Sequence, residues 1–172
     1  VQHPTIPTYS LAAYSAWHPR RSLTVSPLTH LEANFTCHQL DCYLPETGSH
    51  HQGLSLLGIS SSLATSSTRM ELLAAITALY APQPTKLATD SAAFQNIANN
   101  IIQAPHATPR RPWQLISDGD LWRLFQELVA ARDIGGVKIT KIQDNTINEA
   151  NWLGNRIADH QAGQAWKAID PN

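Results

Sequence analysis

The hydrophobic positions change their period along the chain. From Tyr9 to about Ile59, apolar residues form short runs bounded by Pro, Gly or Ser, which is typical of strands. From Met70 onward, most apolar residues recur every three or four positions, which predicts helices. The predicted strands cover residues 9–17, 33–44, 54–61, 86–89 and 137–143, and the predicted helices cover 70–80, 94–102, 121–129 and 150–168.

The order of these elements indicates an α/β fold. Three consecutive strands followed by alternating helices and strands predict a mixed sheet, with helices on both faces or on one face and an edge. The 172 residues correspond to one domain. We expect this domain to span residues 9–172, and residues 1–8, which include two prolines, to form a linker, loop or arm.

Composition narrows the functional classes. Hydrophobic residues make up 42% of the chain, which is enough for a core and excludes general disorder. Twelve Lys and Arg against 13 Asp and Glu exclude a strongly basic protein that coats nucleic acid, but leave room for a weak contact. No apolar run reaches the roughly 18 residues of a membrane helix, so we expect no membrane partner. Cys37 and Cys42 suggest no disulfide, which favours the cytoplasm or nucleus.

Three acidic residues lie at or within predicted helices and strands where their side chains could meet. Glu71 stands at the start of a helix, Asp90 at the end of a strand, and Asp159 inside the last helix. Carboxylates that converge repel one another, and a hard divalent cation relieves that repulsion. Each acid also has a simpler explanation: Glu71 and Asp90 favour helix N-termini, and Asp159 suits a solvated helix face. The case for a site therefore depends on their combination.

Four short motifs around these acids resemble those of type 1 ribonuclease H domains. They are TRMELLAAI at 68–76, TDS at 89–91, GDLW at 119–122 and GNRIAD at 154–159, and they follow the family's order. The similarity covers about residues 54–168. The tryptophan-containing run before Gly154 is most similar to the ribonuclease H domains of non-LTR retrotransposon polyproteins. Because the first residue is Val1, we also expect the chain to be a piece of such a polyprotein.

This resemblance implies a fold, an activity and a site. The fold would be ribonuclease H-like: a five-stranded mixed sheet in the order 3-2-1-4-5, flanked by helices. The activity would be endonucleolytic cleavage of the RNA strand of an RNA–DNA hybrid with two Mg²⁺ or Mn²⁺ ions, beside a neighbouring reverse transcriptase domain. The family's pattern places catalytic and metal-binding roles on Glu71, Asp90 and Asp159. It places substrate binding on Ser67, Thr68, Ser91 and Asn155, although helix capping also explains Ser67 and Thr68.

One acid of the family pattern is missing, because residues 1–31 contain no Asp or Glu. The family carries an Asp on its first strand. In one register that strand is the run 11–17, and Ala16 occupies the lost catalytic position. In the other register this run is already the second strand, and the first lies before Val1. The family's loop histidine is also missing, since Asn145 stands at about that position.

These departures leave several functional hypotheses open. The first is a hybrid nuclease impaired by the missing acid, and the second is an inactive domain that acts as a spacer or a weak nucleic-acid contact. A transposase-type or integrase-type nuclease is disfavoured, because those enzymes carry their Glu on a late helix. A purely structural domain predicts that Glu71, Asp90 and Asp159 lie more than about 10 Å apart.

Overall fold

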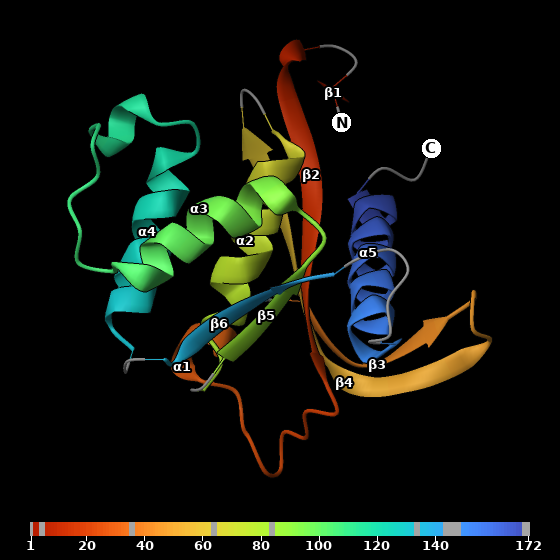
Figure 1. The fold of residues 1–172 in the computed structure, drawn as a ribbon. Helices are drawn as coiled ribbons and strands as arrows, with labels where there is room; N and C mark the ends of the chain where they lie inside the picture. Colours follow the sequence, from red (N-terminus) through yellow and green to blue (C-terminus); the bar gives the residue numbers. More distant parts are fainter. Residues whose placement is uncertain are drawn as a thin grey trace.

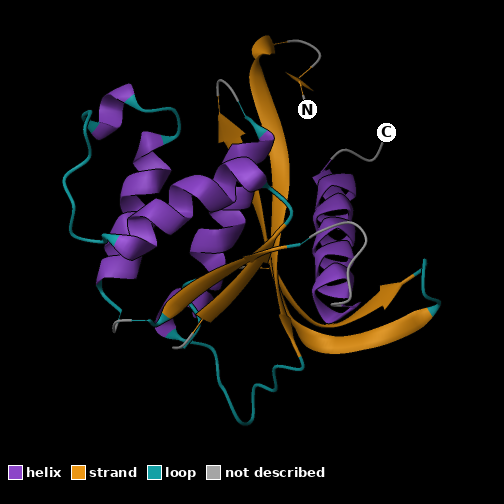
Figure 2. Ribbon diagram, in the orientation of Figure 1, coloured by secondary structure: helices purple, strands orange, loops and turns teal. Residues whose placement is uncertain are grey.

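The computed structural model describes residues 2–3, 6–34, 37–62, 65–82, 85–132, 135–142 and 149–169. It has an α/β fold (Figures 1 and 2). The strands are β1 (Gln2–His3), β2 (Ile6–Pro19), β3 (Cys37–Leu44), β4 (Ser49–Ser62), β5 (Thr85–Thr89) and β6 (Val137–Lys141). The helices are α1 (His30–Ala33), α2 (Ser67–Ala78), α3 (Ala92–Gln103), α4 (Gly119–Ala130) and α5 (Glu149–Ile169), with a 3₁₀ turn at Trp113–Leu115.

The described strands form two sheets. The first is antiparallel, in the order β1-β2-β4-β3, and its longest ladder joins β2 to β4 from the pair Ser10–Ser62 to the pair Pro19–Gly53. The second consists of β5 and β6, which are parallel. The predicted α/β class, with parallel and antiparallel strands and flanking helices, is confirmed. The described strands do not form one five-stranded sheet, so the order 3-2-1-4-5 stays a prediction.

Helices lie on both sides of β2. In Figure 1, α2, α3 and α4 lie on one side and α5 on the other, and both α2 and α5 contact β2. The main core lies among α2, α3 and α4, where Phe94 stacks on Trp122 at a centroid distance of 5.6 Å and Phe125 meets Trp122 edge-on at 5.7 Å. The helical period of α3 and α4 places these rings on one buried face. A smaller cluster, which includes Cys42, Leu44 and Ile157, lies between α5 and the antiparallel sheet.

Most predicted elements are confirmed to within a few residues, with differences near the N-terminus. Residues 2–3 and 6–8, which we expected to form a linker, loop or arm, belong to β1 and β2. The predicted strand 33–44 overlaps the end of α1, and β3 begins at Cys37. Helix α1 forms because Thr29 and Glu32 make a capping box, in which each side chain accepts the other's backbone N–H.

The start of α4 depends on a close backbone approach. A Cβ atom on Gly119 would lie 1.8 Å from the carbonyl oxygen of Trp113, so this position requires glycine. Asp118 adopts a left-handed conformation (φ 55°) and makes no side-chain cap. Instead, Asp118 and Asp120 both accept hydrogen bonds from Arg69 on α2, at 3.0 Å and 2.8 Å. These ion pairs join the N-termini of α2 and α4.

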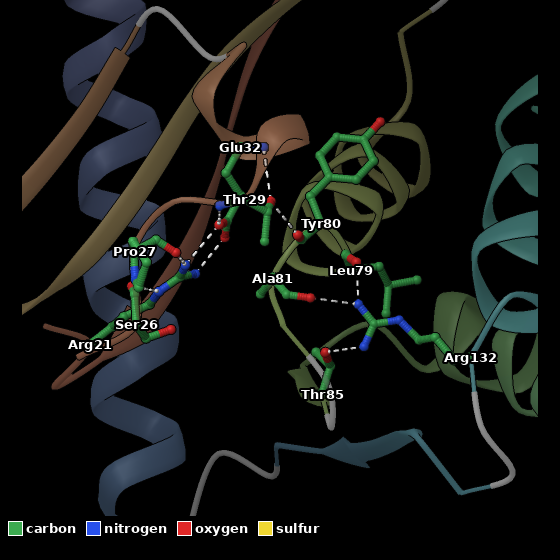
Figure 3. A network of polar contacts seen from close by, with 10 residues as sticks. All are labelled: Arg21, Ser26, Pro27, Thr29, Glu32, Leu79, Tyr80, Ala81, Thr85 and Arg132. Carbon is green, nitrogen blue, oxygen red and sulfur yellow. Dashed lines mark hydrogen bonds and ion pairs between the residues drawn. The ribbon is translucent and has the colours of Figure 1, made fainter. Parts of the chain in front are cut away.

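One arginine and one threonine hold the chain at the C-terminal end of α2 (Figure 3). Arg132 donates to the carbonyl oxygens of Leu79 and Ala81 and to the hydroxyl of Thr85. Thr29 donates from Oγ1 to the carbonyl oxygen of Tyr80 at 2.7 Å. The last carbonyls of a helix have no partner within it, so these donors satisfy groups that would otherwise need water. They also connect the end of α2 to the first residue of β5.

The second arginine holds the segment between β2 and α1. Arg21 forms a two-pronged ion pair with Glu32, and its guanidinium also donates to the carbonyl oxygens of Ser26 and Pro27. Glu32 further accepts the N–H of Thr29 at 2.8 Å. Because Thr29 also donates to Tyr80, this network attaches the long connection after β2 to the chain that follows α2.

Candidate functional site

Glu71 is attached to the end of β5 by a side-chain hydrogen bond. Thr89, the last residue of β5, donates from Oγ1 to Glu71 Oε2 at 2.8 Å. The same hydroxyl oxygen accepts the N–H of Ser91 at 3.1 Å. Glu71 lies near the start of α2 and is half-buried, while Asp90 directly follows β5 and is exposed. The Thr89 hydroxyl therefore brings two of the predicted site residues to one edge of the molecule.

Helix α5 brings the third acid to the same edge. Asn155 donates from Nδ2 to Asp90 Oδ2 at 3.3 Å. Asp159 follows Asn155 by four residues, and residues four apart lie on one face of a helix. Asn155, Asp159 and Glu71 also line one pocket. The face of α5 that carries Asn155 and Asp159 is thus turned toward the carboxyl end of β5.

The three acids act on one another electrostatically. Partial burial raises the pKa of Glu71, and the charges of Asp90 and Asp159 raise it further, against the lowering effect of the Thr89 hydrogen bond. Partial burial also raises the pKa of Asp159, and the charge of Asp90 adds to this, whereas Arg156 lowers it. Glu46, which is paired with Arg156 at 2.7 Å, raises the pKa of Asp159 slightly. The charge of Asp90 thus disfavours ionisation of both Glu71 and Asp159.

A metal ion requires closer grouping than this. Carboxylate oxygens are the ligands that Mg²⁺ and Mn²⁺ prefer, so the donor chemistry is suitable. Among the described residues, however, no three His, Cys, Asp or Glu side chains are grouped so that they could hold a metal ion. Glu71, Asp90 and Asp159 in this arrangement do not by themselves form a ligand set.

The pocket beside these acids has a volume of about 450 Å³. Its walls come from the second half of β2, the inner face of α2, the whole of β5 and the N-terminal half of α5. Ala16, the position that one sequence register assigns to the lost acid, lies on β2, is buried, and lines the pocket. The pocket thus lies between β2 and β5, and Glu71 and Asp159 lie at one of its borders.

The four predicted substrate-binding residues have different surroundings. Ser66, and not Ser67 or Thr68, caps α2, since its Oγ accepts the N–H of Arg69 at 3.1 Å. Helix capping therefore does not account for Ser67, which is exposed and lines the pocket, or for Thr68. Ser91 caps α3 by accepting the N–H of Phe94 at 3.2 Å. Asn155 is bonded to Asp90, as described above.

One residue that orients the acids, Thr89, was not predicted from the sequence, and one predicted position, Asn145, cannot be compared with the structure. Thr89 orients Glu71, and its place directly before Asp90 was the available signal. Asn145, the position of the family's loop histidine, lies outside the described residues. Gln164 donates from Nε2 to His160 Nε2 at 2.9 Å on the exposed side of α5.

Comparison of the chain with protein-family models, with curated proteins and with solved structures gave no match. The resemblance to ribonuclease H domains therefore rests on the four motifs alone. In the part of the chain that the structure describes, no helix combines the length and apolar character needed to cross a membrane.

Replacing Glu71 with Gln should stabilise the domain near pH 7. The pKa of Glu71 is higher in the folded chain than in the unfolded chain, so folding becomes less favourable as the pH rises through and above its ordinary value of 4.5. Glutamine removes this charge and keeps an oxygen that accepts the Thr89 hydrogen bond. We expect the free energy of unfolding to rise by about 0.5–2 kcal/mol at pH 7, as it does when other unfavourable charges are removed. The increase should be smaller at pH 4.

Urea denaturation at the two pH values measures this effect. The matched control is Glu127→Gln, in an exposed pair with Arg123, which should change stability by less than about 1 kcal/mol. Equal or lower stability of Glu71→Gln at pH 7 would show that the three acids do not repel one another.

Proposed function

We propose that this chain is a ribonuclease H-like domain that acts on the RNA strand of RNA–DNA hybrids, and that its site is impaired in the chain as it stands. The observation that carries this proposal is the meeting of Glu71, Asp90 and Asp159 at the carboxyl end of β5, where Asp90 raises the pKa of both other acids. Ligand sites of α/β proteins concentrate at the carboxyl ends of parallel strands. These acids come from two helices and a strand end, and 88 sequence positions separate Glu71 from Asp159, so their proximity is a product of the fold and not of local sequence.

The direction of the strands supports the same proposal. In Figure 1, β2 runs downward and β5 runs upward. Residues of both strands line the pocket. If a strand ran through the pocket, the order would become β4-β2-X-β5-β6, where X is that strand. This matches 3-2-1-4-5, with β3 as an additional edge strand. In that arrangement β2 takes the place of the family's second strand, which favours the register in which Ala16 is not the lost acid.

Mg²⁺ or Mn²⁺ is the cofactor that this proposal requires. Two such ions, when bound, polarise a phosphodiester and activate water. Glu71, Asp90 and Asp159 are the proposed ligands, and a further carboxylate is needed beside them, because they do not form a ligand set alone. We therefore expect strongly reduced metal binding and cleavage without that carboxylate.

The proposed substrate contact is weak and depends on salt. The net charge is −1, so few phosphates can be neutralised by this domain alone. Ser67 and Thr68 stand beside the acids at the start of α2, where they can reach the 2′-hydroxyls that distinguish RNA from DNA. A neighbouring reverse transcriptase domain of a retroelement polyprotein, in the cytoplasm or nucleus, would contribute most of the affinity for the hybrid.

The second candidate is an inactive domain of the same fold that serves as a structural or weak nucleic-acid-binding module. Two observations favour it: residues 1–31 contain no acid, and the described residues hold no group of three metal-binding side chains. This candidate predicts hybrid binding that does not depend on Mn²⁺ and is unchanged in Asp90→Asn.

The test is a binding and cleavage assay with a labelled RNA–DNA hybrid and a DNA duplex of the same sequence. We expect the unmodified chain to prefer the hybrid, and Mn²⁺ to strengthen that binding by about threefold to tenfold through the neutralised acids. The Mn²⁺ effect should disappear in Asp90→Asn and persist in the control Asp41→Asn, whose side chain is exposed on β3. Equal binding of both duplexes, or a Mn²⁺ effect that survives in Asp90→Asn, would contradict the proposed nuclease site.

A further inference from the structure

We propose that the pocket between β2 and β5 is a groove that accepts one additional β-strand, namely an extended polypeptide segment lying in line with β1. One edge of β2 is paired with β4, and one edge of β5 is paired with β6. The other edges, at residues 13–19 and 85–89, line the same pocket. Neither has a strand partner there among the described residues. Unpaired strand edges offer rows of N–H and C=O groups, which another strand can satisfy.

Strand β1 shows the direction of entry. It pairs with β2 on the edge opposite β4, antiparallel, with Gln2 opposite Ser10. An extended segment that continued this line would run along residues 11–19 of β2, antiparallel to β2. Since β2 and β5 run in opposite directions (Figure 1), the same segment would be parallel to β5. One strand can therefore satisfy both edges and join the two sheets into one.

The helices on both sides leave room for the side chains of such a strand. Helix α5 presents small residues to the pocket at every fourth position, at Ala150, Gly154, Ala158 and Ala162. Helix α2 does the same with Ala74 and Ala78. His18 Nε2, in the pocket wall, is a buried polar atom with no hydrogen-bond partner in the described part of the chain. A strand covered by helices on both faces is rich in Val and Ile, so the segment we propose is predominantly apolar.

The experiment extends the chain before Val1 by about eight Val, Ile and Thr residues, enough to follow β2 to its end at roughly 3.3 Å per residue. A matched extension carries Pro at two central positions, which removes strand donors. Hydrogen exchange is measured at residues 11–19 and 85–89, without metal or nucleic acid. We expect exchange at groove-facing amides of both β2 and β5 to slow by about tenfold or more with the first extension only.

Three results would overturn the proposal. They are equal protection by both extensions, protection of β2 without β5, and a dimer of the unextended chain in which both edges are already protected. Ala162→Phe fills the groove and should abolish the protection in the extended protein. If this variant does not fold, the comparison of hydrogen exchange between the two extended proteins still tests the proposal. Because the measurement uses no hybrid and no metal, it can fail without affecting the proposed nuclease function, and it can succeed even if that function is wrong.

Discussion

Replacing Glu32 with Ala should lower the free energy of unfolding by about 3–5 kcal/mol, because the change leaves the Arg21 guanidinium buried without its counter-charge. The Glu32 side chain is 0% exposed and that of Arg21 is 8% exposed, so water cannot replace the lost carboxylate. The change also removes the acceptor for the Thr29 N–H and weakens the hydrogen bond from Thr29 to Tyr80, which lies just after α2. The loss of stability should therefore extend to the C-terminal end of α2, which precedes β5.

Denaturant unfolding of two matched variants makes this expectation specific. Glu127→Ala breaks the exposed pair with Arg123 and should cost less than about 1 kcal/mol. The double change Arg21→Met with Glu32→Leu removes both charges, and it should be more stable than Glu32→Ala alone. A loss below about 1 kcal/mol in Glu32→Ala would show that the pair does not fasten this segment.

The same pair predicts how stability depends on acid. Burial opposes ionisation of Glu32, but the bonds from Arg21 and from the Thr29 N–H outweigh burial and hold the pKa of Glu32 below its ordinary value. The stabilisation is therefore complete above the unfolded value of 4.5 and is lost as the pH falls through the lower folded value. The difference between the unmodified chain and Glu32→Ala should shrink over this range.

The sequence predicted elements better than it predicted their partners. The period of α4 and the order of helices after Met70 follow from local pattern. Helix α1 also has a local signal, because Thr29 and Glu32 stand at the spacing of a capping box. Strand β2 pairs with β4 and not with β3, and this pairing joins residues up to 52 positions apart, from Ser10 to Ser62. The hydrophobic period of a strand shows which face is buried but does not specify so distant a partner.

The site was predicted in outline only. The motifs predict Glu71, Asp90 and Asp159 as site residues, and the structure brings these three acids within reach of one another's charges. The bonds that orient them, from Thr89 to Glu71 and from Asn155 to Asp90, depend on how α2, β5 and α5 pack together. No local pattern contains that information, and none indicated that two strand edges would face one pocket.

Supplying a carboxylate on a strand in the groove should restore hybrid cleavage by about 10³-fold or more. The reason is that a further carboxylate beside Glu71, Asp90 and Asp159 completes a ligand set for two cations, whose contribution is several kcal/mol of transition-state stabilisation. Successive residues of a strand point to opposite faces, so Asp at one of two adjacent extension positions should be active and Asp at the other inactive. Ala16→Asp in the unextended chain should not restore cleavage, since the added strand, and not β2, would occupy the proposed first-strand position.

The most direct test of the proposed nuclease site is therefore cleavage of a labelled RNA–DNA hybrid, in Mg²⁺ and in Mn²⁺, by the chain extended with an Asp-bearing strand. The matched proteins are the same extension with Asn in place of Asp, and the Asp-bearing extension combined with Asp90→Asn. We expect RNA cleavage by the first protein, at a rate about 10³-fold above that of either other protein. Absence of cleavage in all three, while hydrogen exchange shows the added strand protected between β2 and β5, would contradict the assignment of Glu71, Asp90 and Asp159 as a nuclease site.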